Sequence, residues 1–329
     1  MVATAKEESF PRGGTDAARL AYLSRYAVLA PSSHNSQPWR LVIGDGQVDV
    51  YADLSRWLQV ADADRRELHI SIGCAIENLV VAAAHFGESY SLELFPDAGS
   101  AELIARIRLT HGPVPPTLPG LFEAIPRRRT NHQLFTSTPV PAAVLERLCA
   151  ACAEPGIGVH AISSEAPKAA VQDMVVAGTR KEFADPAFRR ELGDWVGRGV
   201  LGTPRPLAPL ARLAVTHVDM GALIARQEAA RFASAPAIIL VASAVDDPRA
   251  QVSAGRVVER VWLAAVHAGL ALQPVSQPLQ VPEVRRHLRD ALEIPEPWPQ
   301  HLFRVGYATG EDRRRPVRDL ADTVMVTGA

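Results

Sequence analysis

Residues 71–87 (SIGCAIENLVVAAAHFG) and residues 253–269 (SAGRVVERVWLAAVHAG) are the two stretches from which the fold can be argued. Superposed at an offset of 182 residues, they share a serine, a glycine, a glutamate, two alanines, a histidine and a final glycine. Both patterns predict long, mostly buried helices that end at the glycine. The match indicates an internal duplication, although two alanine-rich helices could also align by accident.

A weaker pair of segments precedes these helices. Residues 20–31 (LAYLSRYAVLAP) align with residues 144–155 (VLERLCAACAEP) at an offset of 124 and share one alanine and the final proline. The two offsets differ by 58 residues, so the second copy carries about that much extra, mainly helical, sequence. We predict a flexible tail (1–15), a first repeat (16–120) and a second repeat (121–329) with a helical or lid insertion at about 165–232.

Short alternating or apolar runs between the helices predict strands. Residues 40–52 indicate a hairpin around Gly44-Asp45-Gly46, and residues 236–243 (PAIILVAS) are typical of a strand buried on both faces. The predicted fold class is α+β. It consists of two fused, diverged half-repeats that form a pseudo-dimer, with central antiparallel-type sheets flanked by helices.

Composition limits the classes of partner. The chain of 329 residues has a net charge of -1 and a pI near 6.8, which argues against nucleic acid or an anionic membrane. The N-terminal segment is polar, and the apolar run 237–242 is far too short to cross a bilayer, so we expect a soluble, cytoplasmic protein. Cys149 and Cys152 have redox-type spacing, but their helical context favours buried core residues. No second group completes a zinc site, so no metal is predicted.

Two segments carry candidate chemistry. The loop 31–39 (PSSHNSQPW) offers hydroxyls and amides between prolines and could contact the polar edge of a flat heterocycle. Residues 128–132 (RRTNH) place guanidinium groups just before a helix, an arrangement that suits a phosphate. The plainer alternatives are an ordinary polar turn and a solvated basic turn.

These segments resemble the FMN-dependent nitroreductase family. PSSHNSQPWRLVI (31–43) is similar to that family's PSSxNxQPWxFVV segment, and RRRTNHQLF (127–135) followed by PVPAAVLERL (139–148) resembles its N-terminal RRSxR-like start. HLFRVGYA (301–308) with RRRPVRDL (313–320) resembles its last strand and basic tail, and the whole pattern looks most like the Acg-type branch. The resemblance implies an α+β fold that normally forms an intertwined homodimer with FMN at the interface.

The two copies have lost complementary parts of that family's site. The first keeps the PSSxN loop without an arginine motif, and the second keeps the arginine motif, with CAEPGIGVHAI (152–162) where the loop should stand. We therefore predict one FMN per chain at the interface of the repeats, and a monomer that needs no partner to complete the site. Further dimerisation through other surfaces stays open.

The resemblance also implies which residues hold the cofactor. Arg128 and Thr130 would meet the phosphate and ribityl chain, with Arg129 nearby, and His132 stands where relatives carry a lysine or arginine beside the ring. The loop approaching the ring would be Pro274 to Gln277. The full set is Pro31, Ser32, Ser33, Asn35, Arg128, Arg129, Thr130, His132, Gln227, Val275, Ser276, Gln277, Arg314 and Arg315.

Three functions remain open on the sequence. The first is NAD(P)H-dependent reduction of nitroaromatic, quinone or similar electron-poor rings. The second is a non-catalytic protein that stores or sequesters FMN under a lid, for which residues 196–213 are the candidate segment. His132 in place of a permanent cation leaves the reducing power of the site in question. The third is an unrelated α/β domain whose motif matches are accidental.

Overall fold

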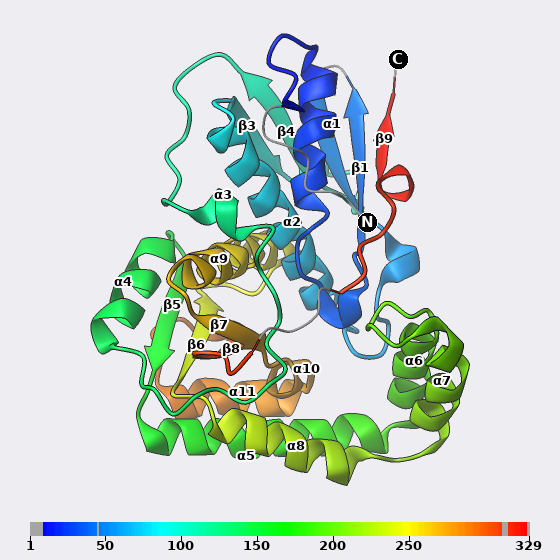
Figure 1. Cartoon of the computed structure of the whole chain (residues 1–329), viewed down its shortest axis with the longest axis vertical. Helices are drawn as coiled ribbons and strands as arrows, with labels where there is room; N and C mark the ends of the chain where they lie inside the picture. Colours follow the sequence, from blue (N-terminus) through cyan, green and yellow to red (C-terminus); the bar gives the residue numbers. More distant parts are fainter. Residues whose placement is uncertain (1–8, 45, 311–314, 328–329) are drawn as a thin grey trace.

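The computed structural model describes residues 9–44, 46–310 and 315–327. It contains two sheets, one in each half of the chain, and we call residues 9–120 the first half and residues 121–310 the second half (Figure 1). Sheet A has the strand order β3-β4-β2-β1-β9 and sheet B the order β5-β6-β8-β7. The strands are β1 (Trp39–Gly44), β2 (Gln47–Ala52), β3 (Ser89–Leu94), β4 (Leu103–Thr110), β5 (Ile157–Ile162), β6 (Ala237–Ser243), β7 (Ala271–Pro274), β8 (Trp298–Gly306) and β9 (Val324–Val326).

Helices cover both sheets and fill the space between them (Figure 1). The first half contributes α1 (Asp16–Ala27) and α2 (Arg66–His85). The second half begins with α3 (Leu121–Ala124) and α4 (Ala142–Cys152), and continues with α9 (Pro248–His267), α10 (Gln277–Gln280) and α11 (Pro282–Leu292). The predicted insertion forms α5 (Glu165–Ala184), α6 (Pro186–Gly197), α7 (Ala208–His217) and α8 (Gly221–Ala233). The α+β fold class is confirmed.

The two halves share one topology. Without β9, sheet A has the order β3-β4-β2-β1, and sheet B has the corresponding order β7-β8-β6-β5. Helices α2 and α9 each have 20 residues and begin and end 182 positions apart. The insertion α5–α8 stands between β5 and β6, where the first half has only the tight turn between β1 and β2.

Helices α2 and α9 cross at two equivalent glycines. A Cβ on Gly73 would lie 2.2 Å from the carbonyl oxygen of Val252, and a Cβ on Gly255 would lie 2.1 Å from that of Ile70. Only glycine permits this approach, because the backbones are in contact. The hydrogen bond of 2.8 Å between His69 Nδ1 and Gln251 Oε1 also joins positions 182 apart. The contacts are therefore reciprocal, as in an interface with two-fold symmetry.

The end of the chain returns to sheet A. Strand β9 pairs in parallel with β1, in the register Leu41 with Val324 (Figure 1). Arg318 anchors this return, because its Nη1 donates to the carbonyl oxygens of Gln37 at 2.9 Å and Trp39 at 3.2 Å. The terminal segment thus packs with the first half, although it follows the second half in sequence.

One apolar core runs through both halves and a second lies under the insertion. Alternate residues of β6 separate them, since Ile239 and Val241 face the large core while Ile238 and Leu240 face the second. The prediction that this strand is buried on both faces is confirmed. Helix α2 is apolar and long enough to cross a membrane by composition, but 89% of that window is buried inside the protein, as in a core helix.

Two smaller expectations can also be compared with the structure. Cys149 and Cys152 are buried and free in α4, and burial raises the pKa of the first thiol to about 11 and of the second to about 12. The equivalent His85 and His267 belong to two helices that are predicted to be mostly buried, but they are not core residues. Both are exposed in the last turns of α2 and α9, where a histidine suits the free carbonyls of the helix end.

Candidate functional site

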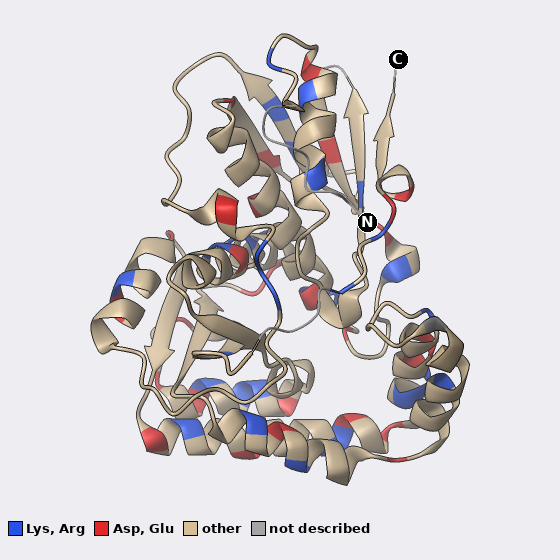
Figure 2. Cartoon of the chain, in the orientation of Figure 1, with Lys and Arg blue, Asp and Glu red and all other residues tan. Residues whose placement is uncertain are grey.

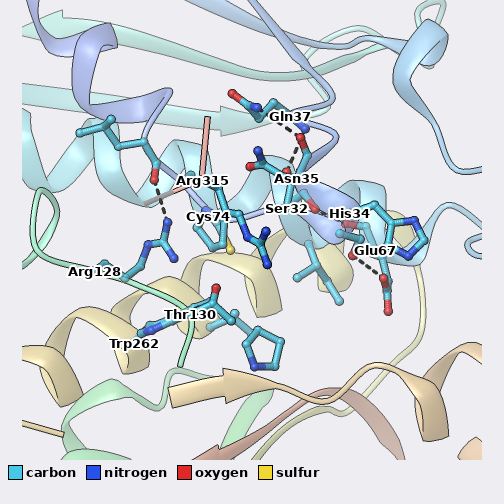
Figure 3. Close-up of a pocket in the computed structure, with 18 of the residues that line it drawn as sticks. Ser32, His34, Asn35, Gln37, Glu67, Cys74, Arg128, Thr130, Trp262 and Arg315 are labelled. Atoms are coloured by element: carbon cyan, nitrogen blue, oxygen red, sulfur yellow. Dashed lines mark hydrogen bonds between the residues drawn. The ribbon is translucent and has the colours of Figure 1, made fainter. Parts of the chain in front are cut away.

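A cavity of about 270 Å³ lies between the two halves, close to the lower end of the roughly 300–1,000 Å³ typical of ligand pockets. In Figure 3, Arg128, Thr130 and Trp262 stand at one end and Glu67 and His34 at the other, with Arg315 between them. Its walls comprise Val28, Leu29, Ala30, Pro31, Ser32, Ser33, His34, Asn35, Gln37, Glu67, Ile70, Ser71, Cys74, Arg128, Arg129, Thr130, His132, Leu201, Val258, Trp262, Gln273, Pro274, Ser276, His301, Arg315, Pro316 and Val317.

The loop 31–39 has a strained backbone held by side chains. His34, Asn35 and Gln37 have φ values of 49°, 52° and 51°, in the left-handed region that non-glycine residues rarely adopt. Ser32 Oγ accepts a hydrogen bond of 2.8 Å from the Gln37 backbone N–H and closes the turn. Asn35 Nδ2 donates to the carbonyl oxygen of Pro316 at 2.8 Å, so the tail fixes the loop from outside.

Arg128 defines the basic end of the cavity. Its Nη2 donates to the carbonyl oxygen of Leu29 at 3.0 Å, and its guanidinium lies 4.5 Å from the ring centre of Trp262. Arg128 Nε is 3.5 Å from Oε1 of Glu259, which is fully buried on α9. Burial raises the pKa of Glu259 to about 7, although the positive charge of Arg128 opposes the shift.

The segment that follows Arg128 is fixed by backbone hydrogen bonds. Thr130 bridges to Leu272, and the Asn131 N–H donates to the Leu272 carbonyl at 2.9 Å, which continues sheet B beyond β7. Buried Arg304 on β8 donates to the carbonyl oxygens of Asn131 at 3.0 Å and Gln133 at 2.7 Å. Residues 129–133 therefore have a defined path past the cavity.

The opposite end of the cavity is rich in polar groups from both halves. Glu67, only 3% exposed, accepts hydrogen bonds from Ser33 Oγ and, at 3.0 Å, from Gln280 Nε2. Arg66 pairs with its second oxygen at 3.2 Å. His301 also lines this end; burial, with the charge of Arg66 in addition, lowers its pKa to about 3, so it is neutral. Its Nε2 has no hydrogen-bond partner among the described residues.

A cation stands beside His132. Arg315 Nη2 lies 3.0 Å from His132 Nε2, and donation along this bond requires a neutral imidazole that accepts at Nε2. Both side chains line the cavity. Position 132 has no permanent positive charge of its own, and Arg315 of the C-terminal segment supplies one beside it.

Part of the insertion closes the cavity. Leu201, in the turn after α6, lines it directly. The carbonyl oxygen of Val200 accepts a hydrogen bond of 2.8 Å from Asn35 Nδ2, and a Cβ on Gly202 would lie 2.8 Å from Arg315 Nη1. Residues 200–202 of the segment 196–213, which we call the cover, therefore lie against the cavity.

The structure brings most predicted site residues together. The residues that line the cavity are Pro31, Ser32, Ser33, Asn35, Arg128, Arg129, Thr130, His132, Pro274, Ser276 and Arg315. Val275 is buried in the second core, and Gln277 begins α10 against Gly178 rather than among the lining residues. Arg314 lies outside the described residues.

Gln227 is not brought to the cavity. Its side chain is exposed on α8, whose buried residues, Ala225 and Phe232 among them, lie on the other side of that helix. Its neighbour Arg231 pairs with Glu228 at 2.5 Å and does not line the cavity either. Only helical periodicity guides the alignment in this region, and the structure places both residues outside the lining of the cavity.

Several lining residues escaped the sequence analysis. Glu67, Ser71 and Cys74 follow one face of α2, and Val258 and Trp262 follow one face of α9. Their spacing of three or four residues is the signal that could have identified them. Among the described residues, no group of three or more histidine, cysteine, aspartate or glutamate side chains could hold a metal ion.

Comparison with known proteins identifies the family. The model described as "Nitroreductase family" matches residues 125–307. "Putative NAD(P)H nitroreductase Rv3131" of Mycobacterium tuberculosis is 30% identical over 305 residues, covering 89% of this chain and 86% of the relative. "Putative NAD(P)H nitroreductase acg" of the same organism is 26% identical over 310 residues, covering 89% and 92%.

Solved structures show more distant similarity. The FMN and NADPH-dependent nitroreductase NfnB from sphigopyxis sp. strain HMH is 20% identical, with a TM-score of 0.45, covering 64% of this chain and 99% of that one. NfnB from Mycobacterium smegmatis, solved with NADPH, is 17% identical with a TM-score of 0.41, covering 61% and 95%. On the family model and the curated relative of 30% identity, the chain belongs to the nitroreductase family.

Proposed function

We propose that the chain binds one FMN in this cavity and acts as an NAD(P)H-dependent reductase of nitroaromatic, quinone or similar electron-poor rings. One observation carries the proposal: residues 31–35 of the first half line the same cavity as Arg128, Arg129, Thr130 and His132 of the second half. Each segment alone is half of a flavin site, and the fold joins them.

The residues present fit the chemical groups of FMN. Arg128 and Arg129 at one end suit a phosphate, which guanidinium groups bind with paired hydrogen bonds. Ile70, Val258 and Trp262 offer apolar surface for a flat ring. Ser276, Glu67 and the unpartnered Nε2 of His301 can meet the polar ring edge at the other end.

Duplication followed by loss explains a single site. We infer it from the shared strand order and from the reciprocal contacts at the α2–α9 crossing. At the equivalent second position, Arg256 and Arg260 replace Cys74 and Asn78. Their Nε atoms bind Glu77 at 3.1 and 2.8 Å, and Arg260 also reaches Glu154. We infer that this largely buried ionic cluster takes the place of a second cofactor site.

When bound at this site, the flavin would supply the chemistry of hydride transfer between NAD(P)H and the acceptor. Arg128 and Ser33 would bind and orient the cofactor. Trp262 and Leu201 would exclude water from the cavity. Arg315 supplies a fixed positive charge beside His132, where negative charge on a reduced ring would be stabilised. The protein would work in the cytoplasm, where NAD(P)H is available.

The first test is the absorbance spectrum after FMN reconstitution, combined with flavin-to-chain stoichiometry and native mass. We expect one FMN per monomeric chain, lost in an Arg128→Ala/Ser33→Ala double variant. Two FMN per chain would contradict the complementary loss of half-sites. A colourless protein unaffected by FMN would remove the flavin assignment.

Storage of FMN is the second candidate function, and the cover favours it. Asn35 is bonded to Val200 of the insertion, and such a closed site slows exchange of ligand and acceptor. Steady-state oxidation of NADPH with menadione or a nitrofuran distinguishes the two functions. Turnover well above that of free FMN supports the reductase, whereas FMN bound tightly without such turnover supports storage.

A further inference from the structure

A second pocket, of about 440 Å³, lies behind the polar end of the cavity. Its walls come from the turn before α2, from α10 and α11, and from the start of β8. Gln280 lines this pocket and donates to Glu67 of the cavity at 3.0 Å. The two spaces are therefore separated by one layer of side chains, and no predicted site residue lines the second pocket.

One wall of the second pocket is an exposed aromatic ring. Trp298 has 39% of its surface exposed, which is high for so large an apolar side chain. Pro297 and Pro299 flank it, and Pro282 lines the pocket as well. The Arg285 guanidinium lies 5.7 Å from the ring centre, so the ring already has a cation near it. A flat aromatic ligand could stack on this surface.

The facing helix presents positive charge. Helix α11 carries Arg285, Arg286 and Arg289, and all three line the pocket. Figure 2 shows the blue Lys and Arg positions along this helix. Arg285 is already bound within the protein, because it pairs with Asp246 at 2.7 Å and donates to the Pro299 carbonyl oxygen at 2.8 Å. Arg289 pairs only with its exposed neighbour Asp290, a type of contact worth little in water. Arg286 is exposed and forms no hydrogen bond or ion pair with another described residue, although its charge acts on Glu283, which pairs with Lys181.

The two carboxylates that line the pocket, Asp62 and the exposed Asp64, accept backbone hydrogen bonds at the start of α2. Asp62 accepts the backbone N–H groups of Glu67 and Leu68, both at 2.8 Å, at the start of α2. Asp64 accepts the Arg66 N–H at 3.2 Å. The side chains of the pocket that can bind a ligand are therefore an aromatic ring, Trp298, and two cations, Arg286 and Arg289.

We propose that this second pocket binds a nucleoside phosphate, with the base against Trp298 and the phosphate on Arg286 and Arg289. A stacked ring next to paired arginines suits this class better than a simple inorganic anion, which would use the arginines alone. The ligand has two possible sources: a free nucleotide that regulates the protein, or the adenosine phosphate end of NADPH. The second source rests on the proposed reductase function.

The test is isothermal titration of FMN-loaded protein, and of protein without added FMN, with 2′,5′-ADP, 5′-AMP and inorganic phosphate. We expect 2′,5′-ADP to bind once per chain in both preparations. Arg286→Ala/Arg289→Ala should weaken binding at least about tenfold, as loss of charge-assisted hydrogen bonds predicts. Trp298→Ala should weaken it similarly and Trp298→Phe much less. Arg226→Ala, an exposed arginine on α8, is the control and should change nothing.

Steady-state kinetics separates the two sources. If the pocket serves the cofactor, Arg286→Ala raises KM for NADPH several-fold but not KM for NADH, which lacks the 2′-phosphate. If the ligand is a free nucleotide, both values stay unchanged while 5′-AMP and 2′,5′-ADP bind alike. Absence of nucleotide binding to the wild type, or binding that survives both the arginine and the Trp298→Ala changes, would overturn the proposal. The calorimetry does not depend on turnover, so it can fail independently of the proposed function.

Discussion

Arg128 shows how single residues set the chemistry of the site. It lies over the Trp262 ring, donates to Leu29 and faces the buried carboxyl of Glu259. Burying two charges is costly, and removing one partner leaves the other uncompensated. A planar guanidinium can stack on an aromatic ring and still bind phosphate, and a lysine cannot do both.

Arg128→Lys therefore tests geometry separately from charge. We expect FMN binding to weaken by roughly 10- to 100-fold, because the paired hydrogen bonds and the stacking on Trp262 are lost while the charge remains. Titration of flavin fluorescence measures the Kd. Arg226→Lys, exposed on α8, serves as the matched control. Unchanged affinity in Arg128→Lys would show that the phosphate is held elsewhere.

Glu259 predicts a pH dependence of stability. Its pKa is raised from 4.5 to about 7, so between these values only the folded state holds the proton. The stabilisation is complete below the unfolded pKa and disappears as the pH rises through the folded one. Relative to Glu259→Gln, the wild type should lose about 2 kcal/mol of unfolding free energy between pH 5 and pH 8. Urea denaturation at the two pH values measures this; parallel curves would contradict it.

At the scale of elements, the α2–α9 crossing sets the distance between the two halves of the site. Ile70, Ser71 and Cys74 of α2 and Val258 and Trp262 of α9 form cavity walls on either side of it. Any separation of these helices changes the width of the cavity as well as the packing of the core.

Gly73→Ala should force the helices apart. The added Cβ would meet the Val252 carbonyl at 2.2 Å, and the backbone cannot yield as a flexible side chain can. We expect a loss of about 1–3 kcal/mol in unfolding free energy together with weaker FMN binding. Thermal denaturation measures the first effect. Gly13→Ala is the control, since nothing lies within 4 Å of its added Cβ.

The contact between the loop and the cover makes a kinetic prediction. Asn35→Ala removes the hydrogen bonds to Val200 and Pro316, both 2.8 Å. At about 1 kcal/mol each, the loss of both should speed FMN release by roughly 30-fold. Stopped-flow fluorescence after dilution reports the rate. Gln227→Ala should leave it unchanged, because that side chain is exposed and outside the cavity. Equal release rates in wild type and Asn35→Ala would count against a closing cover.

At the scale of the whole molecule, the two halves depend on each other. The large core includes residues of α1, α2, α4 and α9, and β9 returns the chain end to sheet A. Neither half encloses the cavity alone. The proposed monomer thus resembles an intertwined dimer whose interface has become an interior.

This dependence predicts cooperative unfolding. Circular dichroism and flavin fluorescence should follow one coincident urea transition, as expected when no intermediate is populated. Truncation after residue 315 should destabilise the first half and the site together, because it removes Arg318 and β9. Two separated transitions in the full-length protein would show instead that the halves fold as independent domains.

The sequence by itself predicted the two long helices, the doubly buried strand and the two segments that line the cavity. These features are local: periodicity, prolines and runs of arginine are visible within about 20 residues. The repeat of strand order agrees with the duplication that the paired helices indicate.

Tertiary structure decided the rest, because it depends on contacts between residues far apart in the chain. Only the fold shows that Gln227 is outside the cavity, that Arg315 meets His132 across 183 positions, and that β9 joins sheet A. The second pocket is of the same kind, since Trp298 and Arg286 come from separate elements that face each other only after folding. Sequence patterns predict which side chains of a helix or strand are buried. Only the packing of the whole chain determines which residues of other elements those side chains contact.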